Sequence, residues 1–147
     1  MISKVDKKIL ELLQLDSRMP ITQIANEVNM SENGVKYRLD KLEKKGVIKR
    51  FSLLIDPRKV GKKVMAIFDI MIEPKSMKKS IPSLSKLDEF IKVYQATGEH
   101  PILAIGLFES NDNLNDFINN TLLVDFPIKD YKVNIVTKRY KDSIYLL

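Results

Sequence analysis

The sequence predicts an α+β protein in which three short helices precede a four-stranded sheet with two helices, in the order βαββαβ. Apolar residues recur at helical spacing through residues 1–46, and strand-like apolar runs alternate with helical stretches from residue 64 onward. With 147 residues, 44% of them hydrophobic, the chain is long enough to bury a core. We expect a helical domain at 1–46, a hinge at 47–61 and a sheet domain at 62–147.

The first domain has the pattern of three packed helices. Apolar residues recur at helical spacing from Val5 to Leu13, and a second helix starts after Pro20, which suits a helix start. Ser31 is a suitable N-cap for a third helix, and Gly46 supplies the left-handed residue that ends it. Only two or three residues separate the second helix from the third. This tight connection predicts a helix-turn-helix motif at about residues 21–45.

The second domain is predicted from apolar runs that alternate with helical stretches. We expect strands at 64–73, 90–97, 102–108 and 131–139, and helices at 76–86 and 113–123. The resulting βαββαβ order is that of a ferredoxin-like domain. A short connecting strand is expected at 47–55 in the hinge, closed by Asp56, Pro57 and Gly61.

Two of these strands, 64–72 and 102–108, carry apolar residues on both faces. Two helices cover only one face of a four-stranded sheet, so the other apolar face needs a different cover. We expect a second copy of the chain to provide it, which makes the protein a homodimer. The alternative is that the N-terminal helices fold back over this face.

The composition excludes several classes of chemistry. The chain has no cysteine and one histidine, His100, which excludes zinc fingers, thiol nucleophiles and iron-sulfur clusters. We find no phosphate-binding, dinucleotide-binding or nucleophile-elbow motif, and we expect no enzyme activity, cofactor or metal. No run approaches the roughly 18 to 20 apolar residues of a membrane span, and the first residues lack a signal peptide's apolar region. We therefore expect a soluble, cytoplasmic protein with no membrane partner.

The net charge of +6 is concentrated in the N-terminal part of the chain. Residues 1–60 contain 13 Lys and Arg against 8 Asp and Glu, whereas residues 61–147 contain 12 against 11. Between Lys36 and Arg50, seven positive residues are accompanied by only Asp40 and Glu43. This pattern favours a polyanion partner, double-stranded DNA. The alternative is that these lysines only solvate a helix, and charge alone does not decide between the two.

The third helix has an apolar face and a cationic face. At about 100° per residue, Val35, Leu39 and Leu42 fall together and the polar residues fall opposite. The major groove of B-DNA admits one helix, whose N-terminal residues reach base edges while later residues meet phosphates. The predicted DNA-binding residues are Ser31, Asn33, Lys36, Tyr37, Arg38, Lys41, Lys44 and Lys45.

The members of this set have different expected roles. Asn33, Lys36 and Tyr37 are placed at base edges, and the lysines from position 41 onward at phosphates. Ser31 is either an N-cap or a phosphate contact, and Arg38 either packs against the core or binds phosphate. A carboxylate at position 40 repels phosphate unless a neighbouring lysine pairs with it.

A series of spaced positions in this region also carries a family resemblance. The positions are 5–14, 16–18, 24–25, 31, 35, 38–39, 41–43 and 46–48, with Asp56, Pro57 and Gly61 in the hinge. Together they resemble the N-terminal domain of Lrp/AsnC regulators, also called feast/famine regulatory proteins. The resemblance implies a winged or extended helix-turn-helix joined to a ferredoxin-like domain that dimerises and often assembles into tetramers or octamers. It also implies binding near amino-acid metabolism genes and, in many members, an amino-acid effector.

The effector loop of that family commonly reads Thr-Gly-x-Tyr-Asp, and the matching segment here is Thr97, Gly98, Glu99, His100 and Pro101. His100 replaces the aromatic residue and Pro101 replaces the acid. The changes remove a carboxylate that would hold an α-amino group, and proline also lacks a backbone donor. Residues 97–101 are the candidate effector-binding segment, in which His100 is either a polar ligand or an ordinary turn residue.

The sequence favours a sequence-specific DNA-binding transcriptional regulator of the Lrp/AsnC type that acts as a dimer or higher oligomer. The first alternative is an architectural, chromatin-like protein that wraps DNA with little sequence choice. The second is an amino-acid-binding domain that controls an enzyme, with its helices contacting protein. Salt-sensitive DNA binding separates the second from the others, and discrete sites separate the regulator from the architectural protein.

Overall fold

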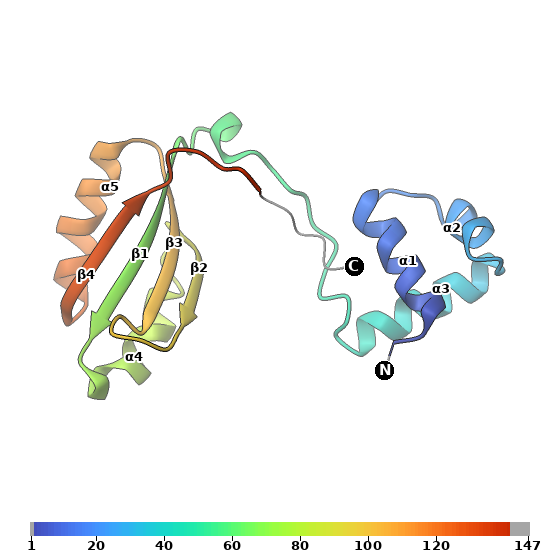
Figure 1. Ribbon diagram of the computed structural model, residues 1–147, viewed down its shortest axis with the longest axis horizontal. Coiled ribbons are helices and arrows are strands. Elements are labelled where there is room, and N and C mark those ends of the chain that lie inside the picture. The colour runs from blue at the N-terminus through green and yellow to red at the C-terminus, as the bar shows by residue number, and fades with distance from the viewer. Residues whose placement is uncertain (1, 142–147) are drawn as a thin grey trace. The chain divides into compact units, whose positions relative to one another are not determined.

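The computed structural model describes residues 2–141 and divides the chain into two compact units, one extending to Leu54 and the other spanning Ile55–Tyr140. The first unit contains α1 (Lys4–Leu15), α2 (Ile21–Glu27) and α3 (Glu32–Lys44). The second contains a four-stranded sheet with helices on one side (Figure 1). The predicted class is confirmed: helices come first and a βαββαβ domain follows.

The first unit is a small three-helix core. Ile9 of α1, Ile24 of α2 and Val35 of α3 are all fully buried and belong to one apolar cluster. Asn29 adopts a left-handed conformation with φ of 52° in the connection between α2 and α3, a region that asparagine tolerates better than most residues. This single residue lets the two helices follow each other closely, as the helix-turn-helix prediction requires.

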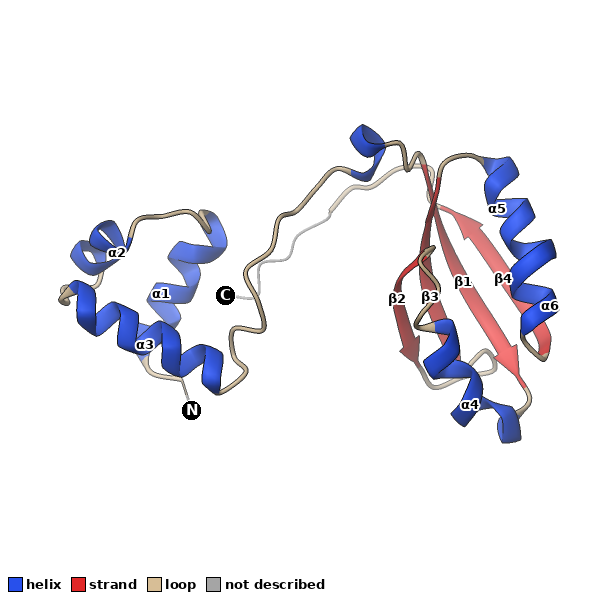
Figure 2. Ribbon diagram, turned by 180° about the vertical axis from the view of Figure 1, so that it is seen from behind, coloured by secondary structure: helices blue, strands red, loops and turns tan. Residues whose placement is uncertain are grey.

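The second unit is an antiparallel sheet in the order β2-β3-β1-β4. Its strands are β1 (Val64–Ile72), β2 (Phe90–Gln95), β3 (Ile102–Phe108) and β4 (Ile128–Ile135). Its helices are α4 (Pro74–Leu84) and α5 (Asn111–Phe117), and α5 continues through a π-helical turn, η2 (Ile118–Leu122), into α6 (Leu123–Asp125). These helices lie along one face of the sheet (Figure 2).

The face under the helices is closely packed. Alternate residues of β1 and β3 are buried there, and Phe68 contacts the rings of Phe90, Phe108 and Phe117 at centroid distances of 5.1 to 6.1 Å. Gly106 lies among these rings, where an added Cβ would be 2.7 Å from Cε2 of Phe108. The ring cluster therefore requires glycine at this position.

The opposite face of the sheet, which we call the open face, is apolar but incompletely covered. Its residues on β1 and β3 include Met65, Ile67, Leu103, Ile105 and Leu107, each of which is only partly buried. Ile67 lies directly across from Ile105 in the strand register. The two-sided apolar character predicted for these strands is thus present, with one side buried under helices and the other only partly buried.

Some predicted boundaries are wrong. Residues 47–55, all of which the structure describes, form no strand, because no segment of the described chain pairs with them and a strand exists only as part of a ladder. A 3₁₀ turn, η1 (Pro57–Val60), follows, and Asp56 caps it with a hydrogen bond from the Arg58 N–H at 3.0 Å. The helix predicted at 76–86 starts at Pro74, since proline suits the first helical turn.

The strand predicted at 131–139 also lies a few residues earlier in the chain, at Ile128–Ile135. Its limits follow its partner rather than its own sequence, because Ile128 pairs with Ile72 at the last residue of β1. Pro82 lies inside α4, and the helix ends two residues later at Leu84. Proline has no backbone N–H to donate to the carbonyl four residues earlier and its ring crowds that carbonyl, which fits a helix that ends soon after Pro82.

Candidate nucleic-acid interface

The orientation of α3 is fixed by its buried stripe. Val35 is fully buried and Leu42 is 4% exposed, while Leu39 packs against the Val35 cluster from its edge. Ser31 caps the start of the helix, where its Oγ accepts a hydrogen bond from the Gly34 N–H at 3.1 Å. The predicted N-cap role of Ser31 is confirmed. Gly46, with φ of 68°, follows the last turn in the left-handed conformation expected for it.

The polar side of α3 faces solvent. Of the predicted DNA-binding residues, only Arg38 is partly buried; the exposed ones are Ser31, Asn33, Lys36, Tyr37, Lys41, Lys44 and Lys45. Tyr37 is 66% exposed, and Nζ of Lys41 lies 5.9 Å from its ring centroid. We call these seven residues the α3 outer face.

The lysines of the α3 outer face have no acidic partner within ion-pair distance in the described part of the chain. Among residues 2–141, none of them forms an ion pair, and Asp40 forms none with its neighbours either. An unpaired ammonium loses no existing partner when it binds a phosphate. The surface is therefore ready to receive a polyanion, apart from the local repulsion from Asp40.

Arg38 is already engaged within the helical unit. Its Nη1 lies 2.8 Å from Oδ1 of Asp6 and 3.2 Å from Oγ of Ser3, at the first turn of α1. Ser3 and Asp6 themselves form a capping box. The contact ties the start of α1 to the middle of α3, which favours the packing role of Arg38 over a phosphate contact.

The same contact changes the acidity of Asp6. Burial raises the pKa of Asp6, but hydrogen bonds from Ser3 and Arg38 outweigh it and leave the pKa below its ordinary value. A lowered pKa in the folded state means that the contribution to stability is complete above the unfolded pKa and is lost as pH falls through the folded value. The tie between α1 and α3 therefore weakens only in acid.

The candidate effector segment forms the turn between β2 and β3. It is closed by a hydrogen bond from the Ala96 N–H to the Pro101 carbonyl at 2.8 Å, and Gly98 has a φ of 121°. Thr97 and Glu99 are exposed.

The side chain of His100 is only 8% exposed, and its Nε2 lies 2.8 Å from Oδ2 of Asp130. Asp130 stands near the start of β4, thirty positions further along the chain, and no local signal links it to the turn. The hydrogen bond with His100 lowers the pKa of Asp130. The Asp130 carboxylate thus lies beside the turn, although position 101 is proline where the family pattern has an acid. Asp130 is not among the residues that the sequence predicts for this site.

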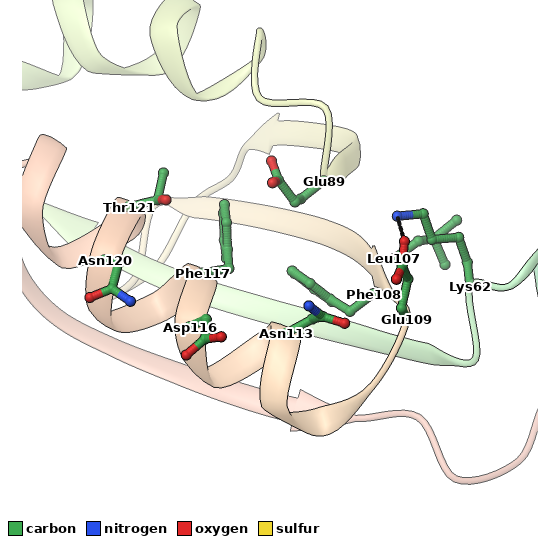
Figure 3. Close-up of a pocket in the computed structure, with 10 residues that line it drawn as sticks. All are labelled: Lys62, Glu89, Leu107, Phe108, Glu109, Asn113, Asp116, Phe117, Asn120 and Thr121. Carbon is green, nitrogen blue, oxygen red and sulfur yellow. Dashed lines mark ion pairs between the residues drawn. The ribbon is translucent and has the colours of Figure 1, made fainter.

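A separate hollow of about 440 Å³ lies between α5 and the end of β3 (Figure 3). Its lining is mostly polar, with three carboxylates, Glu89, Glu109 and Asp116, and one cation, Lys62. Nζ of Lys62 is 3.6 Å from Oε1 of Glu109. Within the described residues, no group of three or more potential ligands is arranged to hold a metal ion.

Among residues 2–141, no helix combines the length and the apolar character that crossing a bilayer requires.

Two family models match the chain. Residues 2–49 match a winged helix-turn-helix DNA-binding domain, and residues 65–146 match the Lrp/AsnC ligand binding domain. The HTH-type transcriptional regulator Ptr1 of Methanocaldococcus jannaschii is 30% identical over 143 residues, which cover 97% of each chain. LrpA of Pyrococcus horikoshii is 32% identical over 122 residues, covering 83% of this chain and 86% of its own.

Two solved structures have the same fold as this chain. A transcriptional regulator of Neisseria meningitidis, solved as an L-Met complex, superposes with a TM-score of 0.93 at 25% identity, over 100% of this chain and 97% of its own. AsnC of E. coli shares the fold, with a TM-score of 0.93 at 23% identity, over 99% and 98% of the two chains. The matches confirm a regulator rather than an enzyme. The chain belongs to the Lrp/AsnC family of DNA-binding transcriptional regulators.

Proposed function

We propose that the chain regulates transcription by reading specific DNA sites as a homo-oligomer, with the α3 outer face in the major groove. The observation that carries this proposal is the set of exposed, unpaired lysines on α3, opposite its buried stripe. Asn33, Lys36 and Tyr37 lie in the first half of the helix and contact base edges, and the lysines further along contact phosphates. Ser31 keeps its cap while its exposed hydroxyl remains free to donate to a phosphate.

Lys44 and Arg38 make a matched test of the phosphate contacts. Changing Lys44 to Ala removes an unpaired surface cation, so the slope of log affinity against log salt should fall in magnitude by about 0.9 for every DNA sequence. Changing Arg38 to Ala should leave that slope unchanged and instead lower the free energy of unfolding by about 1 to 3 kcal/mol, because Asp6 loses its partner. Salt titrations of DNA affinity and urea denaturation measure the two effects. A reduced salt slope for Arg38→Ala would show that Arg38 contacts phosphate.

Asn33 tests sequence readout. Selection from random DNA should yield two related half-sites separated by about one or more helical turns of roughly 34 Å. Changing Asn33 to Ala should alter the selected bases, whereas Lys44→Ala should select the same bases with lower affinity. A uniform loss of affinity with Asn33→Ala would remove the residue from the base contacts. Failure of the original protein to enrich any sequence would favour the architectural alternative.

Self-association is proposed through the open face. Its apolar residues on β1 and β3 are only partly buried in the single chain, and burying them against a second copy removes apolar area from water. The hinge offers a second contact of the same kind, since Phe51, Leu53, Leu54 and Ile55 are 52 to 80% exposed. Pairing with the same segment of another copy would supply the ladder partner that the single chain lacks. Two-fold dimers can assemble further into tetramers or octamers.

The open face is tested by placing a charge on it. Ile67→Arg should shift the protein from dimer or higher oligomer to monomer. The new guanidinium would lie beside Ile105 in an apolar interface with the second copy, and burying an unpaired charge there is costly. Val60→Arg is the control, since Val60 is 63% exposed and lies outside the strands. Sedimentation velocity gives the assembly state and circular dichroism checks that both variants stay folded. The proposed interface is contradicted if the unmodified protein sediments as a monomer. It is also contradicted if the Ile67→Arg variant keeps the assembly state of the unmodified protein.

We also propose that the turn at 97–101 is part of an effector site that takes an amino acid. The Neisseria relative was solved with L-Met bound. Here the Asp130 carboxylate, held beside His100, provides the acceptor for an α-amino group that position 101 no longer offers. Gly98 leaves the turn's backbone open to a ligand, because even an added Cβ would have no neighbour within 4 Å.

The effector proposal is tested by thermal unfolding with each of the twenty amino acids. A ligand at about a hundred times its Kd should stabilise the protein by about 2.7 kcal/mol. Asp130→Asn should reduce that stabilisation strongly, and Asp88→Asn, an exposed acid outside the turn, should not. If no amino acid raises the melting temperature, or if both variants respond alike, the turn is not an amino-acid site.

A further inference from the structure

A second polar hollow, distinct from the turn at 97–101, lies between α4 and the segment that enters β4. Its volume is about 440 Å³, and its lining comprises Lys75, Ser76, Lys79, Ser80, Ser83, Asp125, Phe126 and Pro127. The α4 residues fall at spacings of four or three, so they share one side of that helix. The side therefore presents two ammonium groups and three hydroxyls to the same space.

Ser80 indicates that this space is made for a polar ligand. Ser80 is 6% exposed, and among the described residues it is the one polar or charged residue that is buried. Its hydroxyl forms no hydrogen bond with any described residue, unlike that of Ser83, which donates to the Lys79 carbonyl at 3.3 Å. Among the described residues, the fully buried side-chain atom without a partner is Oε1 of Gln14, so the Ser80 hydroxyl keeps contact with the solvent in the hollow and is free to bond to a ligand there.

The charges around Ser80 favour an anion. Lys79 is exposed and forms no ion pair among the described residues. Lys75 contacts Oε2 of Glu73 at 3.3 Å, but Glu73 is also held by Lys129, whose Nζ lies 3.4 Å from Oε1. Lys75 can therefore turn to a ligand without leaving Glu73 unpaired. The first turn of α4 has no side-chain cap, and its dipole adds to the attraction for an anion.

The other wall of the hollow limits what the anion can be. Asp125 is exposed and unpaired among the described residues, and it repels a second anionic group while accepting hydrogen bonds from hydroxyls. Phe126 adds a partly buried apolar surface beside it. A hollow of about 440 Å³ is also much larger than a bare phosphate ion, and lies in the range of small-molecule sites.

We infer that this hollow binds a small phosphomonoester with a hydroxylated carbon chain, of the sugar-phosphate class. Lys75, Lys79 and the hydroxyls of Ser76 and Ser80 hold the phosphate, and Asp125 accepts hydrogen bonds from the ligand's hydroxyls. The inference does not depend on the proposed DNA readout or on the amino-acid site, because it rests on α4 and the entry to β4 alone.

Calorimetric titration of the full chain with glucose 6-phosphate, glucose and inorganic phosphate tests this inference. The phosphate ester should bind more tightly than either of the other two probes, because only the ester engages both walls. Lys79→Gln should weaken binding of the ester by about ten- to a hundred-fold, as expected for losing a charge-assisted hydrogen bond. Lys78→Gln is the matched control, with the same charge change on the same helix at an exposed position outside the hollow.

Ser80→Ala gives an independent readout. It should weaken ester binding several-fold without lowering the melting temperature, because the hydroxyl has no partner to lose in the free protein. The inference is overturned if the ester does not bind at about 10 mM, which corresponds to a negligible affinity. It is equally overturned if glucose or inorganic phosphate binds as tightly as the ester, or if Lys78→Gln weakens binding as much as Lys79→Gln does.

Discussion

The packing of α3 against α1 and α2 is the constraint on which the proposed DNA-binding surface depends. Val35 and Leu42 are buried, and a helix that buries one stripe must present the opposite side to solvent. That opposite side carries the lysines, so the hydrophobic effect determines where the positive charge is displayed. The Asp6–Arg38 contact adds a polar restraint to the same packing. Specific base contacts need a helix held in one orientation, which neither charge nor helix propensity provides by itself.

The sheet domain follows a similar logic. Helices α4 and α5 cover one face, whose buried phenylalanines leave room only for glycine at position 106. The strands continue with apolar residues on the other face, which the helices do not reach. A regulator that reads paired half-sites needs two copies of α3 at a fixed separation. The proposed self-association through this apolar face would set that separation, and would so connect the sheet domain to DNA recognition.

The sequence predicted the parts of this structure that depend on local patterns. The buried stripe of α3, its Ser31 cap and the left-handed Gly46 each follow from a few neighbouring residues. The errors and omissions involve partners that are distant in the sequence. The strand expected at 47–55 has no partner among the described residues of one chain, and the limits of β4 follow β1. The fold brings Asp130 to His100 and Asp6 to Arg38, and no local pattern in the sequence indicates either pair.

The contact between His100 and Asp130 has a practical consequence. This imidazole is the sole one in the 147 residues, so its ring-proton magnetic-resonance signals are assigned without competition from another histidine. The signal originates in the turn between β2 and β3, on a different unit from α3. The protein thus contains a natural spectroscopic probe at the place where a metabolite is proposed to bind, and events there can be followed without attaching a label.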